Sequence, residues 1–316
     1  MNISGKIFFR LLHLISGAAA AWMLVTAAII FNMPTVVVLL FSAAVIALFC
    51  GSIIKKNLLI PLLAAEISFA IFFMTLSPQK QFENCIFQKE FAVKPEINFL
   101  PDGKFEVINF RQHIYRSPED YDEVFLKKTF DPAKIQSVDI AFVYWGYDSF
   151  VAHNMLNFKF SDGQELAVSV EPRTPVGVGR DPFSCLCKQQ ELLFVIGSPD
   201  DLFDLRSDFR GEDLYVYQTA FSPEEAAIIL DHIIKRTAAL QKNPEFYNLI
   251  TDNCMTAWLP AFQAARPACR YDIRVIFNGL ADRMFFDNGV LERRNGESFE
   301  SLKSRSFIKG KSQGRL

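Results

Sequence analysis

Apolar residues are distributed in two different ways along this chain. From Leu11 to Ile54 no Asp, Glu, Lys or Arg interrupts them, whereas the later part of the chain has short apolar runs between polar turns. The first stretch is about twice the roughly 20 residues that cross a bilayer once as a helix. It therefore predicts two spans, near residues 12–31 and 35–54, with a break at Asn32-Met33-Pro34.

A third apolar segment, residues 58–76, follows the pair Lys55-Lys56 and contains one acid, Glu66. Its length predicts a third span. An ionised carboxylate in mid-span costs roughly 2.5–3.5 kcal/mol. We therefore expect Glu66 to be protonated or hydrogen-bonded inside a three-helix bundle, or to line a polar groove for a lipid headgroup.

The basic residues beside these segments predict an orientation. Lys6 and Arg10 precede the first span and Lys55-Lys56 separates the second from the third, while the first connection has no basic residue. Basic flanks stay on the cytoplasmic side. Three spans place the N-terminus in the bacterial cytoplasm and the main domain in the periplasm, beyond the inner membrane. Two spans would reverse that outcome.

The later part of the chain predicts one α+β domain over residues 101–302. Short segments rich in β-branched or aromatic residues predict six strands, at residues 104–110, 138–144, 151–160, 164–171, 191–196 and 214–219. Ser222-Pro223-Glu224-Glu225 is a capping box that opens a helix to about Gln241. Strands followed by helices are typical of an α+β fold. Residues 78–100 are expected to be a linker and residues 303–316 a basic tail.

Composition supports this division of the chain. Half of the residues are hydrophobic and 14% are aromatic, which excludes a disordered chain. Residues 1–77 hold four basic residues and one acid. The rest holds 29 basic and 34 acidic residues, so its net charge is −5 against −2 for the whole chain. This balance gives no reason to expect nucleic acid as a partner.

Six cysteines are present, and Cys50 lies in an expected span. The other five fall in the domain expected outside the membrane, where disulfides can persist. Cys185-x-Cys187 has no second Cys/His pair at zinc-ligand spacing, so we expect no metal site and no cofactor. A disulfide at Cys185 or Cys187 is the more plausible alternative, with the pairing left open among Cys85, Cys185, Cys187 and Cys269.

Cys254 stands in a distinctive context, because Thr251-Asp252-Asn253 precede it and an apolar segment follows. We expect a helix from Asp252 to about Gln263, bent at Pro260, with the thiol at its N-terminus. Unpaired N–H groups there favour thiolate over thiol and can bind a developing oxyanion. The alternative is a buried structural cysteine that caps a core helix.

A thiolate needs a base, and the domain offers His113, His153 and His232. His232 lies beside Lys235 and Arg236 on an expected solvated helix face, whereas His113 lies in a polar loop and is not excluded. His153 lies in an expected strand whose register can be worked out.

The hairpin turn around Asp162-Gly163 sets that register. A three-residue loop, Ser161 to Gly163, makes paired positions sum to 324, and the apolar faces of the two strands then coincide. In this register His153 stands opposite Glu171, so a carboxylate can orient the imidazole as the third member of a nucleophile–base–orienter triad. A simple surface ion pair is the alternative.

Several blocks around these residues resemble the Lnb N-terminal periplasmic domain family. The blocks run from Ala152 to Phe158, from Ser169 to Arg173, from Pro244 to Asn248 and from Thr251 to Thr256. The resemblance covers about residues 105–265. It departs from the family where Gly177-Val178-Gly179-Arg180 replaces an expected acidic Gly-Glu pair.

The resemblance implies a papain-like domain with the permuted His-before-Cys order of NlpC-type enzymes. It also implies a membrane-anchored lipoprotein N-acyltransferase, with phospholipid as acyl donor and the N-terminal amine of a bacterial lipoprotein as acceptor. By position, Cys254 is the nucleophile, His153 the base and Glu171 the orienter. Candidates for substrate or oxyanion binding are Asn253, Tyr247 and Arg173.

Two other functions fit the same sequence. A cysteine amidase or peptidase acting on peptidoglycan or peptide would keep the Cys254–His153 pair and predicts a hydrophilic, open cleft. A non-catalytic envelope scaffold would have Cys254 disulfide-bonded, buried or far from His153.

Overall fold

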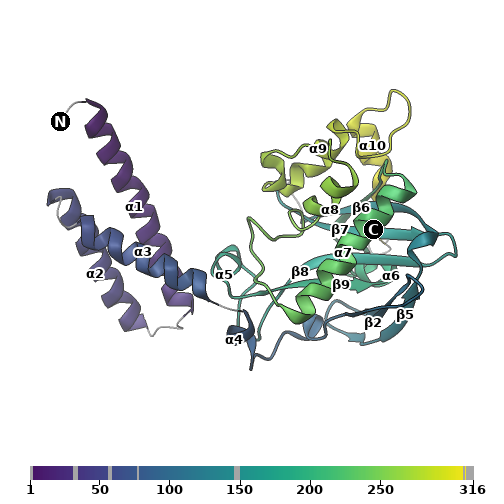
Figure 1. Cartoon of the computed structure of the whole chain (residues 1–316), viewed down its shortest axis with the longest axis horizontal. Coiled ribbons are helices and arrows are strands. Elements are labelled where there is room, and N and C mark those ends of the chain that lie inside the picture. The colour runs from purple at the N-terminus through teal and green to yellow at the C-terminus, as the bar shows by residue number, and fades with distance from the viewer. Residues whose placement is uncertain are drawn as a thin grey trace. The chain divides into compact units, whose positions relative to one another are not determined.

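The structure is a computed structural model that describes residues 3–30, 35–55, 59–76, 78–145, 150–308 and 310. The chain forms two compact units. The first comprises Met1–Cys85 and Gly177–Gln189, and the second comprises Ile86–Val176 and Gln190–Leu316. Both contain helices, and the sheet belongs to the second (Figure 1).

Three apolar helices make up most of the first unit: α1 (Ile3–Ile30), α2 (Thr35–Ile54) and α3 (Leu59–Thr75). Each contacts the other two. The Trp22 ring of α1 packs edge-on against Phe69 and Phe73 of α3, with centroid distances of 5.6 and 4.9 Å. The short helix α4 (Pro78–Phe82) follows within residues 78–100, the segment expected to be a linker.

Only α1 and α2, among the described helices, are long and apolar enough to cross a membrane. The prediction of three spans is therefore wrong for the third segment. Helix α3 has 17 residues and rises about 26 Å, less than the hydrocarbon core of about 30 Å. The predicted orientation, with a cytoplasmic N-terminus and a periplasmic domain, depended on three spans and is therefore no longer supported. The expected break at residues 32–34 lies outside the described residues.

Polar side chains inside this bundle are hydrogen-bonded. Ser16 Oγ donates to Glu66 Oε1 at 2.8 Å, which confirms the prediction of a hydrogen-bonded Glu66. His13 Nε2 lies 3.2 Å from the carbonyl oxygen of Ser52. Within the same unit Cys187 Sγ donates to Thr26 Oγ1 at 3.3 Å, so Cys187 is a free thiol and not the disulfide that we considered.

The second unit is built on one mixed sheet of nine described strands, in the order β1-β2-β9-β8-β7-β6-β10-β11, with β5 paired to β2. The bounds are β1 Glu96–Phe99, β2 Phe105–Arg111, β5 Phe125–Phe130, β6 Ile135–Tyr144, β7 Ala152–Phe160, β8 Glu165–Arg173, β9 Glu191–Gly197, β10 Asp213–Gln218 and β11 Phe307–Ile308. All the pairs are antiparallel except β2 with β9. A separate small ladder pairs β3 (Ile114–Tyr115) with β4 (Tyr121–Asp122).

The six strands predicted from the sequence are confirmed as β2, β6, β7, β8, β9 and β10. The register predicted for the β7–β8 hairpin is also confirmed, because Leu156 pairs with Val168 and Phe158 with Leu166. The loop between them closes through Phe160 N donating to Gln164 O at 3.0 Å. Gly163 takes φ +81° there, which costs glycine little.

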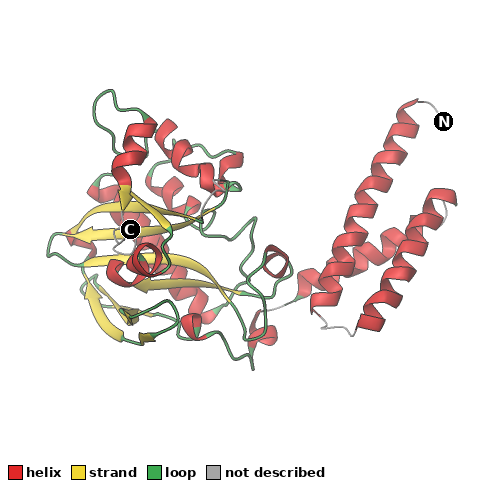
Figure 2. Cartoon of the chain, turned by 180° about the vertical axis from the view of Figure 1, so that it is seen from behind, coloured by secondary structure: helices red, strands yellow, loops and turns green. Residues whose placement is uncertain are grey.

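Helices cover both faces of the sheet (Figures 1 and 2). Helix α7 (Pro223–Lys242) begins at the predicted capping box and contacts β1, β6 and β9 as well as α8 (Leu259–Ala265). Helix α6 (Pro199–Leu202) and the π-helical turn η4 (Leu205–Phe209) contact β8 and β10 respectively. The mixed α+β fold is therefore as expected.

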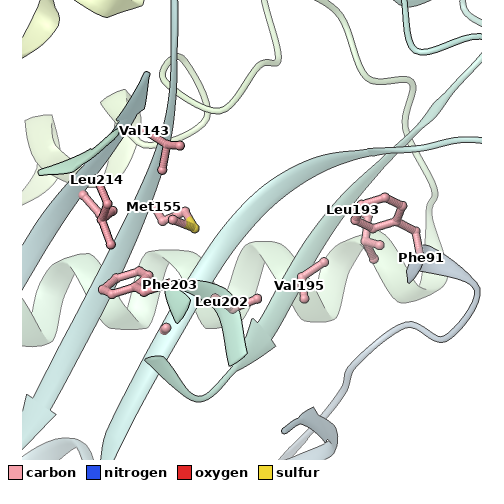
Figure 3. Close-up of a cluster of buried hydrophobic side chains, with 10 residues drawn as sticks. Phe91, Val143, Met155, Leu193, Val195, Leu202, Phe203 and Leu214 are labelled. Atoms are coloured by element: carbon pink, nitrogen blue, oxygen red, sulfur yellow. The ribbon is translucent and has the colours of Figure 1, made fainter. Parts of the chain in front are cut away.

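A continuous apolar core lies between the sheet and the α6 segment (Figure 3). Val143, Met155 and Val195 come from strands β6, β7 and β9, and Leu202 and Phe203 pack against them. The same core holds Phe91, Ala141, Ala167, Leu193 and Leu214. Burial of this cluster fixes the strands that carry the polar residues described below.

The remaining described elements are short. They are α5 (Pro182–Leu186), η2 (Lys89–Phe91), η3 (Pro132–Lys134), η5 (Ile273–Val275), η6 (Asn278–Leu280), α9 (Ala281–Asp287) and α10 (Phe299–Ser306). Lys303 and Arg305, which we assigned to the basic tail, lie in α10. Lys303 Nζ binds the buried Asp282 at 2.8 Å. Most of residues 309–316 lie outside the described residues.

Candidate active site

Cys254 lies in a series of turns and not at the start of a helix, so the prediction of a helix from Asp252 is wrong. Asn253 Oδ1 accepts the N–H groups of Met255 and Thr256 at 2.8 and 2.9 Å. The first helical residue of α8 is Leu259, and Pro260 stands in its first turn. Proline suits the first turn of a helix. Pro260 therefore lies at the start of α8 and, contrary to our expectation, does not bend a longer helix.

This turn holds the Cys254 thiol against the first residues of β7. The sulfur lies 3.8 Å from the carbonyl oxygen of Ala152 and 3.8 Å from Asn154 Oδ1. The Cys254 side chain also helps to raise the pKa of the neighbouring His153. The thiol carries no disulfide and is 5% exposed.

His153 is brought to a carboxylate by the β7–β8 register, as predicted. His153 Nε2 lies 3.0 Å from Glu171 Oε1. Ser169, two residues before Glu171 on the same face of β8, bridges the pair. Its hydroxyl lies 2.7 Å from His153 Nε2 and donates to Glu171 Oε1 at 2.7 Å. His153 Nε2 is thus engaged by both Ser169 and Glu171.

The Glu171 carboxylate is held from its other side by Arg206 of η4. Arg206 Nη2 lies 3.2 Å from Glu171 Oε1, and Nη1 lies 3.3 Å from Glu212 Oε2. His153, Glu171 and Arg206 are all buried. Buried charges persist when they are paired and hydrogen-bonded, and this chain of alternating charge meets that condition.

The surroundings of His153 raise its pKa from the ordinary 6.5 to about 9. Burial, the largest single influence, would lower that pKa. The negative charge of Glu171 and hydrogen bonds from Cys254 and Glu171 raise it, and the charge of Arg206 opposes them in part. The raised pKa favours the imidazolium form of His153 at neutral pH.

Asn278 of η6 closes the site around the sulfur. Its Nδ2 donates to Cys254 Sγ at 3.3 Å, and its Oδ1 accepts the Ala152 N–H at 2.9 Å. One amide thus ties the nucleophile turn to the start of β7. The resulting arrangement is a cysteine that accepts a hydrogen bond from a neutral amide and lies beside the strand that carries His153.

The model of the Lnb N-terminal periplasmic domain matches residues 121–279, half of the chain. The chain belongs to the Lnb N-terminal periplasmic domain family. Comparison with curated proteins and with solved structures gave no match. The matched region contains His153, Glu171, Cys254 and Asn278. With two apolar helices long enough to cross a membrane, the protein combines a candidate anchor with a periplasmic domain of this family.

The other residues predicted for this Lnb-family site serve local structure. Asn253 Nδ2 donates to the Leu249 carbonyl at 2.6 Å, so both ends of that side chain hold the turn. Arg173 binds Glu191 and the carbonyl oxygens of Phe91 and Ala92. None of these three partners belongs to the set around Cys254.

Tyr247 is buried, and its backbone N–H donates to Gln190 O at 3.0 Å. This bond fixes the segment that leads to the Cys254 turn beside the start of β9. Tyr247 therefore supports the nucleophile turn through its backbone.

The two other histidines of this domain lie elsewhere. His113 is buried among aromatic rings, and its Nδ1 accepts the Val124 N–H at 3.0 Å. His232 is exposed on α7, as predicted. Among the described residues, no group of three or more His, Cys, Asp or Glu is placed to hold a metal ion.

Four residues around this site were not predicted from the sequence. Ser169 could have been found, because it lies diagonally across the hairpin from His153 in the predicted register. Asn154 stands within a motif block but has no chemistry that singles it out. Arg206 and Asn278 lie in short irregular turns that have no sequence pattern.

Proposed function

We propose that this protein is a membrane-anchored thiol acyltransferase that moves an acyl chain from a phospholipid, through a Cys254 thioester, to the N-terminal amine of a bacterial lipoprotein. The observation that carries this proposal is that Cys254 packs against Ala152 and Asn154, the residues that flank His153, while His153 Nε2 lies 3.0 Å from Glu171 Oε1. A nucleophile, a hydrogen-bonded partner and an orienting carboxylate form the arrangement that covalent acyl transfer needs.

In the first half-reaction Cys254 acts as a thiolate paired with the His153 imidazolium. The sulfur attacks the ester carbonyl, an S–C bond forms, and the carbonyl electron pair moves to oxygen. The ester C–O bond then breaks, and His153 donates its proton to the leaving alkoxide. Lysophospholipid departs, and the acyl chain remains on Cys254 as a thioester.

The second half-reaction uses neutral His153. An amine attacks the thioester, and a C–N bond forms. The C–S bond then breaks, so Cys254 leaves as thiolate and His153 takes the amine proton. The raised pKa of His153, about 9, favours that proton transfer and regenerates the ion pair. Exclusion of water keeps hydrolysis from competing, and the 5% exposure of Cys254 serves this need.

An apolar donor is supported by exposed side chains on the segments that lead into the site. Phe150 and Val151 precede His153, Phe277 precedes Asn278, and Ile250 lies in the turn before Cys254; these four are 44–58% exposed. Gly279 N donates to Phe150 O at 3.0 Å, which joins two of the segments. Exposed apolar patches mark lipid or ligand contacts, whereas a peptidoglycan amidase would need a hydrophilic cleft.

The family and helices α1 and α2 supply the proposed location. We place the anchor in the bacterial inner membrane and the main domain in the periplasm; because α1 and α2 are two spans, the N-terminus then lies on the periplasmic side as well. Both lipid substrates are then within reach of the same protein. The fold of the domain is proposed to be the permuted papain-like arrangement, because His153 on a strand precedes Cys254 beside a helix.

The test is turnover by the full chain in detergent micelles with dipalmitoyl phosphatidylethanolamine. The acceptor is a synthetic lipopeptide whose N-terminal cysteine carries a diacylglyceryl group and a free amine. We expect N-palmitoylated lipopeptide and an equal amount of lysophospholipid. The N-acetylated lipopeptide is the matched control and should stay unmodified. Cleavage of peptidoglycan fragments with no acyl transfer would replace this proposal with the amidase.

A further inference from the structure

Asn154 has an unusual position beside the nucleophile. It follows His153 on β7, it is 0% exposed, and its Oδ1 lies 3.8 Å from Cys254 Sγ. Its Nδ2 is buried and has no hydrogen-bond partner among the described residues. The amide group of Asn154 therefore borders the reacting sulfur and has a donor without a partner.

An unsatisfied buried donor destabilises the folded state, and such groups are rare unless they serve a function. Asn278 differs in this respect, because both ends of its amide are hydrogen-bonded, to Ala152 N and to Cys254 Sγ. The Asn253 amide is also hydrogen-bonded at both ends, to backbone groups of the turn that holds Cys254. Of these three side-chain amides, only that of Asn154 has a nitrogen without a hydrogen-bond partner among the described residues.

We propose that Asn154 Nδ2 donates to the oxyanion that forms when Cys254 attacks an acyl carbonyl. This inference rests on the proposed function. When the S–C bond forms, the carbonyl oxygen becomes negatively charged and lies two bonds from the sulfur, within reach of an amide that already borders it. When the C–O bond of the donor breaks, the oxygen returns to a carbonyl and the hydrogen bond weakens.

A donor of this kind acts in the transition state more than in the resting protein. Removal of one oxyanion donor typically slows the chemical step by about 10²–10³-fold. A structural role predicts a different outcome, since loss of packing around Cys254 would also change the reactivity of the thiol toward reagents that form no oxyanion. Iodoacetamide is such a reagent, because its alkylation of sulfur displaces iodide at a saturated carbon.

The experiment compares wild type with Asn154→Leu, which keeps the branched shape but lacks the amide, and with Asn154→Ala as a second variant. Asn157→Leu is the matched control. Asn157 lies on the same strand, is buried, and has a hydrogen bond to Glu165 at 2.5 Å rather than contact with Cys254. The probes are p-nitrophenyl butyrate, followed as a burst of p-nitrophenolate, and iodoacetamide, followed as mass gained at Cys254.

We expect either Asn154 variant to acylate about 10²-fold more slowly than wild type, with iodoacetamide rates within about twofold and Asn157→Leu unchanged in both. Wild-type acylation rates in the Asn154 variants would overturn the inference. A parallel loss of alkylation would also overturn it, because Asn154 would then position the thiol. Absence of a wild-type burst, or its survival in Cys254→Ala, would instead refute the proposed function and the inference with it.

Discussion

Two histidines of the periplasmic domain are buried to the same degree, but their pKa values are shifted in opposite directions. His113 and His153 are both 6% exposed. The pKa of His113 is lowered from 6.5, whereas that of His153 is raised to about 9. Burial alone would lower both, since a low-dielectric surrounding disfavours the charged form.

The neighbours of each ring decide the difference. After burial, the strongest influence on His113 is the positive charge of Arg111, which lowers its pKa further. Asp201, the nearest carboxylate, is engaged by the Arg111 guanidinium and by the backbone N–H of His113. His153 instead has its carboxylate 3.0 Å from Nε2. The charge and hydrogen bond of this carboxylate, together with Cys254, outweigh burial, and they separate the candidate catalytic histidine from a structural one.

The largest expected effect comes from replacing His153 itself, the histidine with the raised pKa. His153→Gln should slow acylation of Cys254 by about 10³-fold, because it removes both the partner of the thiolate and the proton donor. His113→Gln is the matched control and should keep activity. Rates are measured as lysophospholipid released per minute. Equal losses in the two variants would show that His153 has no special role.

Glu171→Gln should slow acylation by about 10²-fold and change its pH dependence. Acylation needs the imidazolium, so the wild-type rate should fall as pH rises through about 9. Without the Glu171 charge the pKa of His153 drops, and the fall moves to lower pH. Glu165→Gln on the same strand is the control. An alkaline limb that stays near pH 9 in Glu171→Gln would contradict this explanation.

Ser169→Ala should have a smaller effect, a loss of about tenfold or less. The direct contact of 3.0 Å between His153 and Glu171 remains without the bridging hydroxyl. The alkaline limb of the pH profile should therefore stay close to that of wild type. A shift as large as that of Glu171→Gln would mean that the carboxylate acts on His153 through Ser169.

The smallest expected effect is on the free energy of unfolding. Its dependence on pH has opposite signs for His153 and His113. The stabilisation from His153 is full below pH 6.5 and is lost as pH rises through about 9. The lowered pKa of His113 makes its contribution fall as pH drops below 6.5. Urea unfolding of both Gln variants at pH 5, 7 and 9.5 measures this. The free energy of unfolding should lose its alkaline decline in His153→Gln and part of its acid decline in His113→Gln.

The part of this site that follows regular structure could be predicted from the sequence. Alternation along β7 and β8 gave the pairing sum of 324, and with it the contact of His153 with Glu171. The capping box at Ser222 gave the start of α7. In both cases a local pattern determines where a side chain lies.

The parts that could not be predicted depend on irregular segments. Arg206 reaches Glu171 from a π-helical turn, and Asn278 reaches Cys254 from a 3-10 turn. Their positions follow from tertiary packing, which no spacing in the sequence records. The Cys254 turn was predicted as a helix because an apolar segment follows Thr251-Asp252-Asn253, whereas the Asn253 side chain stabilises a turn that ends before α8.

The central claim is that Cys254 carries the acyl chain, and mass spectrometry of the protein tests it most directly. The full chain is incubated with dipalmitoyl phosphatidylethanolamine without an acceptor, digested, and mapped. Cys269→Ala, which removes a buried cysteine outside the site, is the control. We predict one palmitoyl group on the Cys254 peptide, released by neutral hydroxylamine, in wild type and Cys269→Ala. No adduct at Cys254, or lysophospholipid release that persists in Cys254→Ala, would contradict the account.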